Sequence, residues 1–153
     1  MTNFVLATDR YLLRLLKKYH GPLARVAIFI TFFWFGGLKV FGTSPAGPLV
    51  ASLLQRTLPF MSFETFNLCF GIFEMAIGLL FIIPGLTRVV LPLLAVHLIT
   101  TFLPLIILPA LTWSGPFTPT LEGQYIIKNL VIIALAISLA ATLDPLKPGG
   151  KAH

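Results

Sequence analysis

The sequence predicts an all-α integral membrane protein, a bundle of four transmembrane helices. Of its 153 residues, 57% are hydrophobic and only 10% are charged, whereas about 25% of residues are charged in a typical soluble domain. Several apolar stretches approach the roughly 20 residues that a helix needs to cross a bilayer. A chain of this length has room for about four such crossings, so we expect a single membrane domain without a large soluble part.

The first expected element is an amphipathic helix over residues 8–20, within a basic N-terminal segment, residues 1–23. Its leucines and Tyr19 recur at helical spacing, and its arginines and lysines take the other face. Gly21 and Pro22 are expected to end this helix. Because a basic amphipathic helix is typical of membrane surfaces, we expect the helix to lie in the interface.

The four transmembrane helices are expected within residues 24–143. The expected spans are residues 24–42, 67–85, 89–110 and 125–143. Between the first two, residues 49–60 are too short and too polar to cross, and they predict a short amphipathic segment. Residues 111–124 predict a loop, and residues 144–153 a polar tail.

The distribution of positive charge predicts the orientation of the chain. Eight of the eleven Lys and Arg residues fall in the N-terminal region through Arg25, in the turn after the second span, or in the tail. These regions share one side of a four-span bundle, and positive residues favour the cytoplasmic side. We therefore expect both termini in the cytoplasm.

The scarcity of cysteine and histidine excludes several functions. Cys69 is the only cysteine, so the chain has no dithiol of its own and is not a self-contained thiol oxidase. Only His97 of the three histidines lies in an apolar span, so we do not expect a self-contained cytochrome with two histidine ligands from this chain. The sequence has no cluster of metal ligands, and we expect no metal site. The basic residues sort by membrane side, and we expect no nucleic-acid partner.

A glutamate in the middle of the second span is the most unusual feature of the sequence. Intramembrane ionisable residues are costly and rare, and they usually mark a functional site. Asn67, Gly71, Glu74 and Gly78 follow each other at spacings of four, three and four, and therefore lie on one helix face. Because small residues let membrane helices approach closely, we expect this stripe to face the bundle.

Each of the other spans also carries an ionisable residue. Lys39 ends the first span, His97 lies within the third, and Lys128 begins the fourth. At a rise of about 1.5 Å per residue, Glu74 and His97 both fall near mid-membrane. We therefore predict a polar intramembrane cluster of Lys39, Glu74, His97 and Lys128. Two interpretations stay open, a salt bridge that pins the helices together and a site for a ligand or a proton.

The aromatic run at residues 29–35 has two interpretations as well. Its side chains most often pack against neighbours or contact lipid in such a position. Alternatively, Trp34 and Phe35 form the flat wall of a pocket for a ring-shaped ligand.

Two stretches suggest a family. Residues 24–42, ARVAIFITFFWFGGLKVFG, resemble the first helix of the DoxX-like membrane proteins. Residues 71–88, GIFEMAIGLLFIIPGLTR, resemble their second helix, with its Gly-x-x-Glu-x-x-x-Gly pattern and an arginine after the turn. Residues 100–109 and 122–133 are most similar to the YkgB-like branch, which includes the reactive-chlorine-resistance membrane protein C. The resemblance covers roughly residues 22–143.

The resemblance implies a four-helix bundle in a bacterial-type inner membrane, with Lys39, Glu74 and Arg88 at shared positions. Founding members are described as subunits of a quinol or thiosulfate:quinone oxidoreductase, and others are linked to oxidative-stress defence. We therefore expect a redox-associated, quinone-linked or oxidative-stress subunit that acts with other membrane subunits or as a homo-oligomer. Quinone is the cofactor that this implies, and whether the chain is itself an enzyme stays open. The alternatives are a non-catalytic accessory subunit and a carrier of protons or small molecules.

Overall fold

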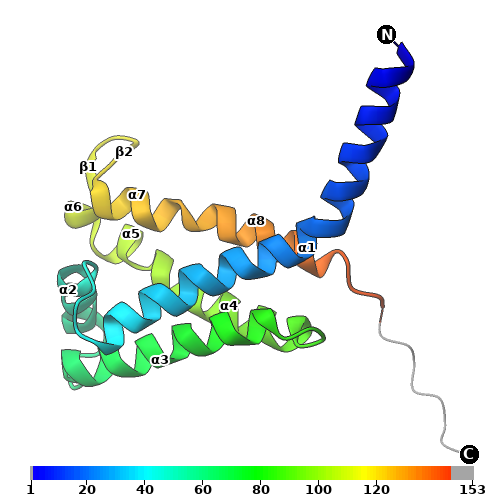
Figure 1. Cartoon of the computed structure of the whole chain (residues 1–153). Coiled ribbons are helices and arrows are strands. Elements are labelled where there is room, and N and C mark those ends of the chain that lie inside the picture. Colours follow the sequence, from blue (N-terminus) through cyan, green and yellow to red (C-terminus); the bar gives the residue numbers. More distant parts are fainter. Residues whose placement is uncertain (1, 146–153) are drawn as a thin grey trace, which may run out of the picture.

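The structure, a computed structural model, describes residues 2–145 and has four helical stretches long and apolar enough to cross a membrane (Figure 1). These stretches are Phe4–Val40, Phe63–Ile82, Thr87–Ile107 and Leu121–Ala140. This agrees with the predicted helical membrane protein. Most of the predicted polar tail, residues 146–153, lies outside the described residues.

The four spans close into a ring around one apolar core. The elements in chain order are α1 (Thr2–Val40), α2 (Gly47–Thr57), α3 (Phe63–Ile82), α4 (Thr87–Phe102), α5 (Pro104–Ile107), α6 (Pro109–Thr112), β1 (Trp113–Gly115), β2 (Thr118–Pro119), α7 (Leu121–Ile127) and α8 (Asn129–Ala140). Helix α1 contacts α3, α3 contacts α4, α4 contacts α8, and α8 contacts α1. Side chains from all four meet in the core, among them Ile28, Phe81, Val90 and Leu139.

The N-terminal segment is not a separate helix, which corrects the predicted break at Gly21 and Pro22. Helix α1 runs without interruption from Thr2 to Val40 with Pro22 inside it. Its first half leaves the bundle at an angle (Figure 1). Proline has no N–H to donate and its ring displaces the preceding turn, so it bends a long helix without ending it. The basic helix is therefore a bent extension of the first span.

The last two spans, predicted as continuous, are each interrupted. Helix α4 gives way to α5 at Pro104 and α5 to α6 at Pro109, since each proline lacks the N–H that would continue the hydrogen-bond ladder. The fourth span is divided into α7 and α8 at Lys128. Each interruption is short, so Thr87–Ile107 and Leu121–Ala140 keep the length of a crossing.

The connections carry more structure than expected. The region predicted as a short amphipathic segment, residues 49–60, holds most of helix α2, which buries Leu53 and Leu54. The predicted loop at 111–124 instead holds the end of α6, an antiparallel ribbon of β1 and β2, and the start of α7. Phe117 takes a positive φ of 54° in the turn between the two strands. A small β-ribbon thus joins an otherwise helical fold.

Candidate functional site

The polar stripe of α3 faces the bundle, as predicted. Asn67, Gly71, Glu74 and Gly78 are all buried. A Cβ on Gly71 would lie 2.7 Å from the carbonyl oxygen of Gly36 in α1, closer than such atoms approach in real structures. The backbones of α1 and α3 are therefore in direct contact at these two glycines, as small residues permit between membrane helices.

This backbone contact positions the charged pair. Lys39 and Glu74 each lie three residues after one of the touching glycines, Gly36 and Gly71, and so share the glycine face of their helix. The Cβ of Lys39 lies against Gly71. A helical side chain leans toward the N-terminal end of its own helix, which directs the lysine along α3 toward the carboxylate.

Three ionisable side chains from three helices meet at Glu74. Lys39 Nζ lies 2.6 Å from Glu74 Oε2, and His97 Nε2 lies 2.7 Å from Oε1. The three residues are only 8%, 5% and 4% exposed, in the order Lys39, Glu74, His97. We call them the triad. An ionised carboxylate only accepts hydrogen bonds, so beside it both the lysine ammonium and His97 Nε2 donate, and each carboxylate oxygen has its own donor.

The other nitrogen of His97 points to a weaker partner. Nδ1 lies 3.4 Å from Thr101 Oγ1, while that hydroxyl donates to the backbone carbonyl of His97 at 2.9 Å. The hydroxyl proton is thereby engaged elsewhere, and a distance of 3.4 Å is long for a hydrogen bond. When Nε2 carries the proton, Nδ1 keeps a free lone pair, so the triad has one site at which a further proton can be held.

Aromatic rings surround the triad. Phe70 stacks on the His97 imidazole with ring centroids 5.0 Å apart, and Phe32 meets it edge-on at 4.9 Å. Phe73 lies at 6.3 Å, and the Lys39 ammonium lies 5.7 Å from the Phe70 centroid. These rings give the ion pair an apolar surrounding, in which electrostatic interactions are stronger than in water. The cation–π contact adds a second partner for the ammonium.

The structure corrects the predicted pocket wall. Trp34 and Phe35 are 66% and 52% exposed. Phe32 and Gly36 are about one helical turn apart and both lie on the inward face of α1. At about 100° per residue, Trp34 is rotated roughly 200° from Phe32 and therefore faces outward. The aromatic residues beside the triad are thus Phe32, Phe70 and Phe73, which sequence spacing alone did not single out.

Lys128 is not part of the cluster, which corrects the fourth predicted member. Its side chain is exposed, and its Nζ lies 5.1 Å from the centroid of the Tyr125 ring. Lys128 stands at the junction between α7 and α8. Tyr125 lies three residues before it on the same side of the helix, so the ammonium finds a local partner outside the bundle.

A second charged contact was not predicted. Arg25 of α1 donates from Nη1 to the carbonyl of Phe81 at 3.0 Å and from Nη2 to Thr87 Oγ1 at 2.7 Å. It thereby joins the end of α3 to the start of α4. The only feature of the sequence that points to this contact is Thr87, directly after the turn between the second and third spans. Arg88 is exposed and donates to the backbone carbonyl of Asp144.

Comparison with models of protein families, with curated proteins and with solved structures gives no match to this chain. The function is therefore argued from its own residues. The feature with most chemical content is the triad, because it places a carboxylate, an ammonium and an imidazole in contact inside an apolar bundle.

Proposed function

We propose that this chain is a DoxX-like subunit of a bacterial-type inner membrane, which works with partner subunits in a quinone-linked redox or oxidative-stress function. The observation that carries the proposal is the buried triad of Lys39, Glu74 and His97. Ionisable residues inside membrane helices are costly and usually mark proton or substrate pathways. The orientation that goes with this proposal has both termini in the cytoplasm, following the positive residues.

The triad has the groups that proton-coupled redox chemistry needs. Reduction of a quinone requires proton donors for its carbonyl oxygens, and a carboxylate or an imidazole can act as donor. Glu74 and His97 are 2.7 Å apart, within reach of direct proton transfer. Lys39 balances the charge of Glu74 at 2.6 Å, so the bundle can hold a carboxylate without a net negative charge in its interior.

A non-catalytic accessory subunit is the second candidate, and a specific observation favours it. Both oxygens of Glu74 already have donors within the chain, and the backbones of α1 and α3 touch beside them at Gly36 and Gly71. An arrangement in which each buried charge is satisfied can serve simply to fix three helices in one register. In that case this chain would position other subunits of a complex.

One experiment separates the two candidates. The protein is purified gently from native membranes as wild type, Glu74→Gln and Glu64→Gln, and mass spectrometry identifies the accompanying proteins, lipids and quinones. Glu64 is the matched control, because it is an exposed glutamate in the first turn of the same helix. The redox proposal expects quinone with wild type and Glu64→Gln but not with folded Glu74→Gln. A fixed set of partner subunits without quinone would identify an accessory subunit. Equal amounts of quinone in all three proteins would show that quinone binding does not depend on the triad.

A further inference from the structure

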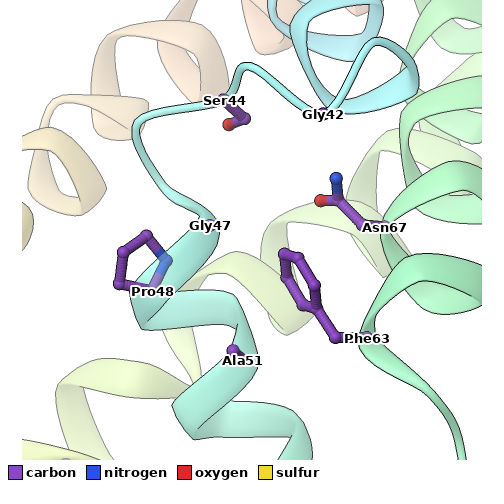
Figure 2. Close-up of a pocket in the computed structure, with 7 residues that line it drawn as sticks. All are labelled: Gly42, Ser44, Gly47, Pro48, Ala51, Phe63 and Asn67. Atoms are coloured by element: carbon purple, nitrogen blue, oxygen red, sulfur yellow. The ribbon is translucent and has the colours of Figure 1, made fainter.

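A cavity of about 330 Å³ lies beyond the triad, where the loop after α1 meets the beginnings of α2 and α3 (Figure 2). Its walls are small or apolar except for two polar side chains. The lining residues are Gly42, Ser44, Gly47, Pro48, Ala51, Phe63 and Asn67. None of these side chains is charged. The volume is at the lower end of the range for small-molecule sites, enough for one ring.

Asn67 gives this cavity a defined hydrogen-bonding character. The residue is only 5% exposed, and its Nδ2 donates to the backbone carbonyl of Lys39 at 2.9 Å. A carbonyl can only accept, so this bond fixes which end of the amide is nitrogen. Oδ1 is then directed into the cavity (Figure 2). Among residues 2–145, it is buried without a hydrogen-bond donor, a state that costs free energy and that few groups in native proteins show.

We propose that this cavity binds an uncharged ring compound with a hydroxyl group, of the phenol class. The hydroxyl would donate to Asn67 Oδ1, which requires a donor and rejects a ligand that only accepts. The ring would lie against the Phe63 side chain, where aromatic and apolar contacts favour a flat apolar body. A charged ligand is disfavoured, because the lining has no side chain of opposite charge.

This inference does not rest on the proposed function. It depends on Asn67 and the cavity walls, whereas the redox proposal depends on Glu74 and His97. Two sources share the ligand chemistry, a free phenol and the head of a lipid-soluble hydroquinone. The hydroquinone differs from a simple phenol in a second ring hydroxyl and in an apolar tail, which would lie outside the cavity.

The test is an NMR measurement on the protein in lipid nanodiscs. Its asparagine residues are labelled with the NMR-active nitrogen isotope. The chain has three asparagines, so the Asn67 side-chain amide can be followed by itself. The probes are p-cresol and toluene, which differ only in the hydroxyl. We expect a saturable shift of the Asn67 signal with p-cresol, at a concentration roughly tenfold or more below any response to toluene. Partition of either probe into lipid does not by itself move this signal saturably.

Two leucine variants locate the binding. Ala51→Leu fills the cavity from α2 without changing Asn67, and we expect it to abolish the response to p-cresol. Ala76→Leu, on an exposed position of α3, is the matched control and should keep the response. The absence of a saturable shift, an equal response to both probes, or an undiminished response in Ala51→Leu would each overturn the proposal and leave a solvent-filled cavity.

A hydroquinone with a ten-carbon alkyl tail distinguishes the two sources, and ten carbons are on the order of a third of a bilayer's hydrocarbon thickness. Saturation at much lower concentration than with p-cresol and with hydroquinone itself, which lacks the tail, would identify the head of a membrane hydroquinone as the ligand. Equal saturation would identify a free phenol, and either result supports the site. The Glu74→Gln variant should bind p-cresol like wild type, so a failure of the redox proposal would leave this result standing.

Discussion

Two regions of the bundle bury different kinds of residue. One is the contact between α1 and α3, and the other is the fourth span, formed by α7 and α8. Helix α3 buries polar and small residues together, with Glu74 and Asn67 beside Gly71 and Gly78. Helix α8 buries only Ala136 and Leu139. Close approach of two backbones at glycines brings a lysine and a glutamate from different helices within 2.6 Å. In the fourth span the close approach, at Gly123, is to the backbone of Thr112 in α6 and not to another span, and Lys128 stays exposed.

The comparison teaches that small residues and buried charge belong together in this bundle. A buried charge needs a partner at hydrogen-bond distance, and the partner reaches it only if bulky side chains do not separate the helices. The α1–α3 contact meets both conditions. The glycine contact of the fourth span, between Gly123 and Thr112, brings no ionisable residue of another span to Lys128. Four substitutions test this contrast, in order of decreasing expected effect.

Replacement of Glu74 by leucine should have the largest effect. It leaves the Lys39 ammonium buried without its carboxylate and removes the partner of His97, so we expect a loss of about 3–5 kcal/mol in the free energy of unfolding. Denaturation of the purified protein in mixed micelles measures this. The double variant Lys39→Met with Glu74→Leu should recover part of the loss, because no unpaired charge remains. A single variant as stable as wild type would show that the pair contributes nothing.

Gly71→Ala should be the next most damaging change. The new methyl group would meet the Gly36 carbonyl oxygen and the Cβ of Lys39 within 3 Å, so the helices must separate, at about 1–3 kcal/mol. Gly37→Ala is the control, since a Cβ there meets nothing within 4 Å. Unfolding in the same assay compares the two. If both alanines were tolerated equally, the two backbones would not be in contact.

Thr87→Val tests the second charged contact, at the other end of α3. Valine keeps the shape but removes the hydroxyl that accepts from Arg25, and we expect a loss of about 1–3 kcal/mol because a charged donor loses a buried partner. Thr31→Val is the control, as its hydroxyl bonds only to its own helix at Ala27. An equal effect of the two substitutions would reduce the Arg25 contact to a surface interaction.

Lys128→Gln should have the smallest effect, within about 0.5 kcal/mol, as is usual for exposed positions. The side chain loses an exposed cation–π contact with Tyr125 and no buried partner. Unfolding and, once a function is measured, activity should both match wild type. A loss of unfolding free energy as large as that of Glu74→Leu would show that Lys128 interacts with the triad, and the two regions would then not differ.

Much of the site could be predicted from local spacing. The stripe of Asn67, Gly71, Glu74 and Gly78 is a property of helical periodicity, and it faces the bundle as expected. A buried carboxylate requires a donor, and few ionisable residues lie in apolar spans, so Lys39 and His97 were the natural partners. Both contact Glu74 in the structure.

The errors share a cause. Trp34, Phe35 and Lys128 were chosen for residue type and estimated depth, but neither property gives the rotation of a helix about its axis. The effect of each proline on its helix was also not predictable from the sequence. Pro22 bends α1, whereas α4 ends just before Pro104, and the sequence around a proline does not say whether neighbouring elements will satisfy the freed carbonyl.

Hydrophobicity and helical period are local properties, so the sequence alone is enough to predict a membrane protein, four spans and the stripe that carries Glu74. The packing of the helices, in contrast, decides three further features: which rings enclose His97, that Arg25 joins two other helices, and that Asn67 Oδ1 is directed toward a cavity without a hydrogen-bond donor. These features depend on the rotation and separation of helices that lie far apart in the chain. Glycine contacts and hydrogen bonds between the helices set that geometry.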